Sequence, residues 1–272
     1  MKRFAVLLML LLAGCGQKDD SAWLGYGEGD YAFVSAPQAG WLTNLATERG
    51  RTVHKGDLLF TLDTTEQLAS RDQAQASLEQ ARASLVQEEA NLTYMNTELA
   101  RQTRLMRANA GTQEAYDQAQ NNARQSAARI AELKAQIGQM EASLSGAAYN
   151  LSQRRIVALT DGPVEDIYYR PGEYVPASTP VVSILPPANV YVRFFVPETQ
   201  LAHVHLGDRV KITCDGCQPM EATVTFVSSQ EEYTPPVIFS VGNREKLVYK
   251  VEARAEGGAP VHPGQPVDVR PL

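Results

Sequence analysis

The stretch that decides the fold is residues 78–106, LEQARASLVQEEANLTYMNTELARQTRLM. An apolar residue returns at every seventh position along it, and the members of this series are Leu78, Leu85, Leu92, Leu99 and Met106. A helix that repeats apolar residues every seven positions presents a narrow apolar stripe, which it buries against another helix in a coiled coil. The stretch therefore predicts one arm of a helical coiled coil.

The partner arm follows in the same chain, where a second series steps by seven through Tyr116, Ala123, Ile130, Ile137, Leu144 and Leu151. The complementary heptad positions hold Ala74, Ala81 and Met95 on the first arm, and Leu133, Met140 and Ala147 on the second. No proline interrupts either arm, and Gly111 stands between them, where left-handed backbone suits a helix end. We therefore expect an antiparallel hairpin over residues 64–153, with arms of roughly 60 Å at 1.5 Å per residue.

Two short β-rich segments flank the hairpin and resemble each other at an offset of 122 residues. Both hold glycines and apolar residues in the same order: Ala36, Gly40, Leu45, Gly50, Val53, Leu59 and Leu62 in the first, and Ala158, Gly162, Ile167, Gly172, Val175, Val181 and Ile184 in the second. Each segment is too small to bury a core alone. We therefore expect residues 36–63 and 154–187 to close on each other as two halves of one domain.

The two halves resemble a split lipoyl or biotinyl domain. The first half carries that family's glycine, valine, Gly-Asp and Leu-Asp residues as Gly40, Val53, Gly56-Asp57 and Leu62-Asp63. In lipoyl carriers the halves join through a tight turn that holds a modified lysine, whereas here the helical hairpin joins them. This departure favours an adaptor over a carrier, because function is decided by the site and not by the fold.

From residue 188 onward the pattern changes to short alternating strands. Strand-like runs occupy residues 191–196, 209–212, 222–227 and 247–251, with turn signals such as Gly207-Asp208 and Pro263-Gly264 between them. They predict a small antiparallel β-barrel over residues 188–272. His203 and His205 lack a carboxylate-rich partner motif, so we expect no metal site there.

Cys214 and Cys217 form the segment Cys-Asp-Gly-Cys. A structural zinc would require two further ligands, and a thioredoxin-like redox site would require a βαβ context. In an exported protein, a disulfide that closes this turn is favoured over free thiols.

The N-terminus predicts export. Lys2 and Arg3 precede an apolar run over residues 4–13, which is much shorter than the roughly 20 residues that a membrane-spanning helix needs. The segment Leu12-Ala13-Gly14-Cys15 resembles a bacterial lipobox, which implies removal of a signal peptide and diacylation of Cys15. An ordinary signal peptide that contains a cysteine is the alternative.

The domain boundaries follow from these segments. Residues 1–14 are then the signal peptide, and residues 15–35 are expected to form the lipid anchor and a linker. Removal of Lys2 and Arg3 changes the formal net charge from −6 to −8. This acidic balance, without a basic cluster, argues against a nucleic-acid partner.

The order of these segments resembles the HlyD-type membrane-fusion proteins, which are periplasmic adaptor subunits of efflux and secretion systems. The resemblance implies an elongated α+β protein, with a split lipoyl-like β-domain interrupted by the hairpin and followed by the barrel. It implies a ring, expected to be a hexamer, in the periplasm, anchored to the inner membrane by lipidated Cys15. The barrels would meet an inner-membrane transporter, and the hairpins a TolC-type outer-membrane channel.

The resemblance also extends to the partners. Residues 231–236 and 247–249 look like those of adaptors that serve ABC-type exporters, and little chain follows the barrel for the further domain of some drug-pump adaptors. A proton-driven pump is the alternative transporter. At the hairpin tip, Arg101, Leu105 and Thr112 match the family's Arg-xxx-Leu-xxxxxx-Ser motif, with threonine in place of serine.

In relatives this tip motif contacts the channel. The resemblance implies that Arg101 pairs with acidic or carbonyl groups, that Leu105 packs in an apolar groove and that Thr112 supplies a hydroxyl. Arg104 and Arg107 lie nearby as alternatives to Arg101.

The sequence does not indicate an enzyme. It has no Walker motif, no nucleophile with a matched base and no metal cluster, so we expect neither catalysis nor a cofactor, and a partner must supply the energy. The expected function is adaptor-mediated export of small molecules or other substrates. A passive periplasmic coiled-coil spacer lipoprotein and a biotinyl or lipoyl carrier subunit are the alternatives.

Overall fold

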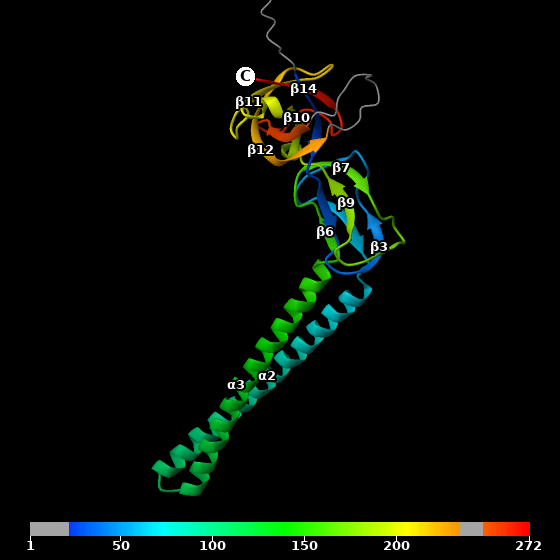
Figure 1. Cartoon of the computed structure of the whole chain (residues 1–272). Coiled ribbons are helices and arrows are strands. Elements are labelled where there is room, and N and C mark those ends of the chain that lie inside the picture. Colours follow the sequence, from blue (N-terminus) through cyan, green and yellow to red (C-terminus); the bar gives the residue numbers. More distant parts are fainter. Residues whose placement is uncertain (1–21, 234–246) are drawn as a thin grey trace, which may run out of the picture.

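The computed structural model describes residues 22–233 and 247–272, so the predicted lipidation site, Cys15, lies outside the described residues. The chain forms three parts in a row: a β-barrel, a module of two small β-sheets, and a helical hairpin that projects from the module (Figure 1). The predicted elongated α+β architecture is confirmed. Among the described residues, no helix combines the length and the apolar character needed to cross a membrane.

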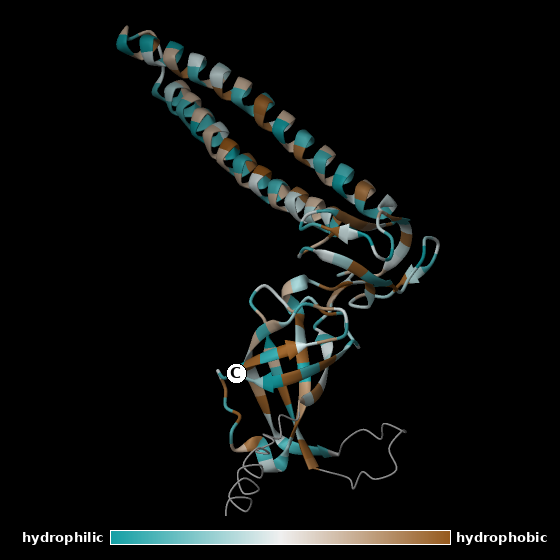
Figure 2. Ribbon diagram, turned by 90° about the horizontal axis from the view of Figure 1, so that it is seen from above, coloured by the Kyte–Doolittle hydropathy of each residue, from teal (hydrophilic) through white to brown (hydrophobic). Residues whose placement is uncertain are grey.

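The hairpin consists of α2 (Thr65–Arg107) and α3 (Gln113–Ser152). At 1.5 Å per residue, the 43 residues of α2 span about 65 Å. Every position of the two predicted seams is buried or half-buried, and Leu78, Ala123 and Ile130 are among the buried ones. Hydrophilic residues cover much of the remaining helix surface (Figure 2). The seam is therefore narrow, as the heptad pattern predicts.

The module combines strands from both halves of the sequence repeat in each of its sheets. One sheet has the order β2-β9-β7-β4 and the other β6-β5-β3-β8. From the first half come β2 (Ala32–Ser35), β3 (Gly40–Leu45), β4 (Thr52–Val53) and β5 (Leu58–Leu62), and from the second β6 (Arg155–Val157), β7 (Gly162–Ile167), β8 (Tyr174–Val175) and β9 (Pro180–Ile184). Each sheet therefore contains strands from both halves.

The sequence repeat is also a structural repeat. Strands β3, β4 and β5 begin at residues 40, 52 and 58, and β7, β8 and β9 begin 122 residues later, at 162, 174 and 180. Equivalent apolar residues enter the shared core as pairs: Ala36 and Ala158, Val53 and Val175, Leu59 and Val181, and Leu62 and Ile184. Gly50 and Gly172 occupy equivalent turns with φ of +80° and +92°, a backbone conformation that favours glycine.

The barrel is closed and has the strand order β1-β10-β13-β12-β11-β14. Its strands are β1 (Trp23–Gly29), β10 (Val190–Pro197), β11 (Arg209–Thr213), β12 (Met220–Tyr233), β13 (Leu247–Arg254) and β14 (Pro266–Pro271). The short helices η1 (Pro187–Asn189) and α4 (Glu198–Leu201) flank β10. Inward residues such as Val192, Phe194 and Ile212 fill the interior.

The expectation that residues 15–35 form only an anchor and a linker was wrong. Within that range, Trp23–Gly29 is the barrel strand β1, which pairs with β10 and β14, and Ala32–Ser35 is the module strand β2. The chain therefore enters the barrel first and builds the module before it returns to the barrel. β14 was also absent from the predicted strands.

The glycines of β1 explain why its sequence does not look like a strand. Gly25, Gly27 and Gly29 alternate along WLGYGEG, and glycine is depleted in strands generally. Here each glycine provides space. A Cβ on Gly25 would lie 2.5 Å from the carbonyl oxygen of Arg193, and one on Gly27 would lie 2.5 Å from that of His262. The neighbouring backbone therefore lies too close to this face of the strand for any residue larger than glycine.

An ion-pair cluster fixes β1 to the barrel from outside. Arg193 on β10 donates to Glu28 of β1 at 2.7 Å and to Glu252 of β13 at 2.9 Å. Arg254 on β13 donates to Asp30 at 2.7 Å, and its guanidinium lies over the ring of Tyr191. The cluster joins three neighbouring strands where the chain leaves the barrel for the module.

Candidate functional site

The candidate site is the hairpin tip, where α2 ends at Arg107 and α3 begins at Gln113. Backbone bonds close the end of α2: the N–H of Ala108 donates to the carbonyl of Arg104 at 3.1 Å, and that of Ala110 to the carbonyl of Leu105 at 2.9 Å. The left-handed residue is Asn109, with φ of 53°, and not Gly111 as expected. Asparagine adopts this conformation more readily than other residues with a Cβ.

Gly111 does not adopt the left-handed conformation, and its lack of a side chain is what the tip uses. A Cβ at this position would lie 3.2 Å from the Cβ of Leu105 and 3.2 Å from the backbone nitrogen of Met106. The connecting segment therefore packs directly on the last turn of α2. Leu105 is half-buried by this contact, and the rest of its side chain remains open to a partner.

Thr112 is the N-cap of α3. Its Oγ1 accepts a hydrogen bond from the N–H of Ala115 at 3.2 Å, which satisfies one of the donors that a helix start leaves without a partner. Serine and threonine both cap helices in this way. The hydroxyl proton is still available as a donor to a partner.

Arg101 is held by a residue that the sequence analysis did not identify. Its Nε and Nη2 donate to the two carboxylate oxygens of Glu98 at 2.9 and 2.6 Å, and Gln102 donates to the same carboxylate at 2.7 Å. The hydrogen bonds from Arg101, followed by that from Gln102, lower the pKa of the Glu98 carboxyl. The i, i+3 spacing of Glu98 and Arg101 is the signal that could have predicted this pair.

Two further cations lie at the tip. Arg104 and Arg107 are exposed in the last turn of α2, where positive charge is favourable at a helix C-terminus. Within residues 22–233 and 247–272 neither has an ion-pair partner, in contrast to Arg101. The tip thus brings together Leu105, the Thr112 hydroxyl and three guanidinium groups, of which one is already paired.

Comparisons with known proteins agree with this architecture. Residues 77–154 match the family model described as the alpha-helical hairpin domain of RND MFP. The crystal structure of MacA from Actinobacillus actinomycetemcomitans superposes with a TM-score of 0.72 at 19% identity, over 91% of this chain and 76% of that one. The periplasmic adaptor protein EmrA superposes with a TM-score of 0.52 at 14% identity, over 93% of this chain and 98% of that one.

This chain has the membrane-fusion-protein fold. The resemblance inferred from the sequence is confirmed, and it includes the hairpin, the module and the barrel. Two curated relatives are named UPF0194 membrane proteins. That of Acidithiobacillus ferridurans is 34% identical over 46% of this chain, which covers only 38% of that protein's length. That of Yersinia pseudotuberculosis is 28% identical over 93% of this chain and 90% of its own length.

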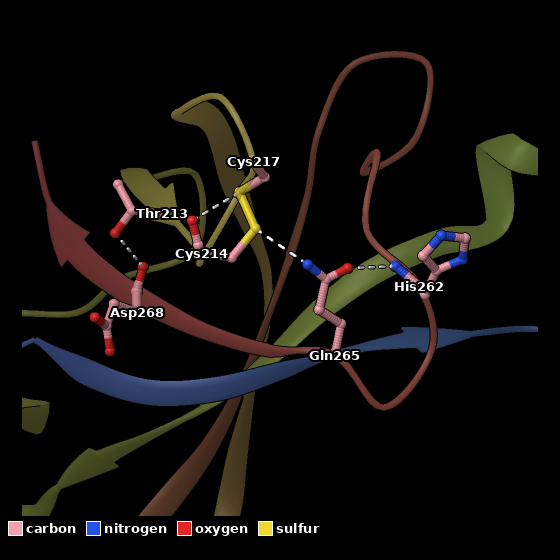
Figure 3. Close-up of a disulfide and its surroundings, with 6 residues drawn as sticks. All are labelled: Thr213, Cys214, Cys217, His262, Gln265 and Asp268. Atoms are coloured by element: carbon pink, nitrogen blue, oxygen red, sulfur yellow. Dashed lines mark hydrogen bonds between the residues drawn. A yellow bond between two sulfur atoms is a disulfide. The ribbon is translucent and has the colours of Figure 1, made fainter.

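A disulfide joins Cys214 and Cys217 of this chain, in the turn between β11 and β12 (Figure 3). The two Cα atoms are 5.4 Å apart. The side-chain nitrogen of Gln265 donates to the Cys214 sulfur at 3.3 Å, while its Oε1 accepts from the N–H of His262 at 3.0 Å. Gln265 therefore connects the disulfide turn to the loop before β14.

The histidines of the barrel do not gather into a metal site. The Nδ1 of His205 lies 3.6 Å from the Oδ2 of Asp208. In the described part of the chain, no group of three or more His, Cys, Asp or Glu side chains is arranged to hold a metal ion.

Proposed function

We propose that the protein is a periplasmic adaptor that links an inner-membrane transporter to a TolC-type outer-membrane channel for the export of small molecules or other substrates. The observation that best supports this function is the position of the tip relative to the barrel. The hairpin leaves the module on the side away from the barrel, so the two lie at opposite ends of the molecule (Figure 1). A protein that joins two distant partners requires two such separated surfaces.

The proposed orientation follows from the N-terminus. The predicted lipid on Cys15 would hold the protein to the inner membrane, on its periplasmic side, and Trp23 of the barrel stands only eight residues later. The barrel would then face the inner membrane, and the tip would face the channel. We further propose that six copies assemble into a ring around the conduit.

An ABC-type exporter is the transporter we favour, on the likeness of residues 231–236 and 247–249 to adaptors of such exporters. Residues 234–236 lie outside the described residues. The description of the matched hairpin model, which refers to RND systems, supports the alternative of a proton-driven pump. In either case the adaptor performs no catalysis, requires no cofactor and obtains its energy from the transporter.

The connection between the module halves favours this function over a carrier subunit. The first half ends with β5 at Leu62, and α2 begins at Thr65, where a carrier would have a tight turn with its modified lysine. A passive spacer does not require a half-buried apolar side chain beside a free cation at its tip. Here Leu105 adjoins Arg104, which is exposed and has no ion-pair partner among the described residues.

Affinity purification of the lipidated protein from gently solubilised membranes, followed by mass spectrometry, tests the proposal. Recovery of an ABC permease with its ATPase and of an outer-membrane channel is expected. Recovery of a proton-driven pump would retain the adaptor function and change the transporter class. Recovery of neither from intact material would contradict the proposal and favour the spacer.

The substitution Leu105→Asp tests the tip directly. A carboxylate in an apolar groove is costly, so we expect the channel to disappear from the purified complex while the transporter remains, and export to stop. Leu159→Asp is the matched control, because Leu159 is 74% exposed on the module, far from the tip. Unchanged channel recovery with Leu105→Asp would show that the tip does not bind the channel.

A further inference from the structure

The two ends of the barrel differ in which segments they carry. Strands β1 and β14 are antiparallel, and Trp23 pairs with Val269, so the start of β1 lies beside the end of β14. The N–H of Leu272 donates to the carbonyl of Arg209 at 3.2 Å, which places the start of β11 at the same end. At the other end β1 leaves the barrel for the module. We call the end with Trp23 the anchor end, because Trp23 stands eight residues after Cys15.

Three exposed leucines lie at or near the anchor end. Leu206 lies in the turn before β11 and Leu272 follows β14, both at the rim. Leu24, the second residue of β1, lies on the wall opposite Asp268, two residues further from this end than Arg270. In the order Leu24, Leu206 and Leu272, their side chains are 69%, 69% and 64% exposed. Phe226, on the wall of the barrel, is the one other exposed large apolar side chain in the described part of the barrel. Exposed apolar surface is therefore concentrated at one end, which is typical of an interaction surface.

A pair of cations lies just inside this rim. Lys211 on β11 and Arg270 on β14 are cross-strand partners, and both point outward because the flanking Val210, Ile212 and Val269 are buried. Neither has an ion-pair partner within the residues that the structure describes. Glu221, the cross-strand neighbour of Lys211 on β12, pairs with Arg209 instead. Lys211 is two residues from the start of β11, or about 7 Å at the rise of a strand.

The length of the N-terminal segment limits where the anchor end can lie. A fully extended chain spans at most about 3.6 Å per residue, so the eight residue steps from Cys15 to Trp23 reach no more than about 29 Å. A lipid on Cys15 therefore limits the distance of the anchor end from the bilayer and allows the leucines to reach its surface. A surface of leucines beside unpaired cations matches that environment, since acyl chains accept the former and anionic headgroups the latter.

We propose that the anchor end of the barrel is a membrane-surface contact. Leu206 and Leu272 insert between lipids of an anionic bilayer, and Lys211 and Arg270 lie at the level of the headgroup phosphates. The inference rests on the lipidation of Cys15 in the proposed function, and it adds a second, non-covalent attachment to the same membrane. The contact would hold the barrel against the bilayer and direct the hairpin away from it.

Site-directed fluorescence in vesicles tests this contact. In the lipidated protein Cys15 is acylated and Cys214 and Cys217 form the disulfide, so an introduced cysteine is the one free thiol. Leu206→Cys and Leu272→Cys are each labelled with a polarity-sensitive fluorophore, and the protein is reconstituted into vesicles of phosphatidylethanolamine and phosphatidylglycerol. Leu159→Cys, exposed on the module beyond the far end of the barrel, is the control.

We expect a blue shift, and quenching by nitroxides on the lipid chains, at positions 206 and 272 and neither effect at position 159. Replacing Lys211 and Arg270 by Gln should weaken the quenching in anionic vesicles and leave it unchanged in vesicles of phosphatidylethanolamine and phosphatidylcholine. Labels at 206 and 272 that behave like the label at 159 would overturn the proposal.

Two further outcomes also decide the question. Shielding of positions 206 and 272 that requires a co-reconstituted transporter would assign the surface to a protein partner and would overturn the lipid contact. The mass of the protein shows whether Cys15 carries the lipid. Absence of the lipid would refute the anchor itself, and the contact with it, whereas absence of shielding in lipidated protein refutes the contact alone and leaves the adaptor function standing.

Discussion

Arg101 and Glu98 form an ion pair at the tip that depends on pH. The pKa of the Glu98 carboxyl is lowered from its ordinary value of 4.5, chiefly by the hydrogen bonds from Arg101. A lowered pKa means that the pair contributes fully above that ordinary value and is lost as the pH falls through the lowered one. We expect the Nε–H signal of Arg101 in NMR spectra to be protected from solvent exchange at neutral pH and to lose protection in acid.

The variant Glu98→Ala provides the control for this titration, because a glutamine would retain an oxygen that could still accept from Arg101. It removes the carboxylate and retains the helix, so the Nε–H of Arg101 should exchange freely at every pH. Protection that persists in this variant would mean that another group holds Arg101.

Gly258 lies where a neighbouring backbone leaves no room for a side chain. Its φ is +98°, and a Cβ would lie 1.9 Å from the carbonyl oxygen of Pro187. Gly257 has a similar φ of +79° with nothing within 4 Å of a Cβ. Both alanine variants carry the left-handed strain of roughly 1–2 kcal/mol. Gly258→Ala should lower the free energy of unfolding clearly further, and equal losses in denaturant titrations would contradict the contact with Pro187.

At the level of single residues, the sequence predicts which residues lie at the tip better than it predicts their backbone conformation. Leu105 and Thr112, which are selected by their match to the family's tip motif, do lie at the end of α2 and the start of α3. The sequence does not predict that Asn109 takes the left-handed conformation and that Gly111 packs on Leu105, because both depend on how the connecting segment folds back over α2.

Among the elements, α2 depends on few buried side chains. Leu78 is only 2% exposed and is the one large apolar residue of α2 in the buried class, whereas Leu68 on the same helix is 42% exposed. Leu78→Ala should destabilise the hairpin by about 2–5 kcal/mol, as large-to-small changes in a core do. Leu68→Ala should cost about 0.5 kcal/mol, as surface changes do. Thermal unfolding followed by far-UV circular dichroism compares them, and equal melting temperatures would show that the seam does not stabilise the hairpin.

The elements that the sequence predicts well are those with a regular period. The seven-residue steps locate both helices, and the offset of 122 residues locates the module strands, because each pattern repeats often enough to stand out. Strand β1 was missed because its three glycines hide the strand pattern, and its close neighbours, β10 and the loop at His262, are distant in sequence.

In the whole molecule, the hairpin sets the distance between the barrel and the tip. Deleting one heptad from each arm, residues 85–91 of α2 and 129–135 of α3, should preserve the seam and shorten the hairpin by about 10 Å. We expect an unchanged far-UV spectrum and continued recovery of the transporter, with loss of the channel and of export. Full export by the shortened protein would mean that the span is not matched to the distance between its partners.

The position of β1 in the barrel has a consequence for biogenesis. In the proposed export, the chain would emerge from its N-terminus, so Trp23–Gly29 would reach the periplasm early. Its partners β10 and β14 follow the module and hairpin in the sequence, and β14 is the last of the described strands. Both edges of this strand would remain unpaired throughout translocation, when an ordinary strand would be prone to pair with another chain. The glycines of WLGYGEG reduce that tendency, because glycine is a poor strand former. The barrel that receives the first strand to emerge is thus the last part of the protein to be completed.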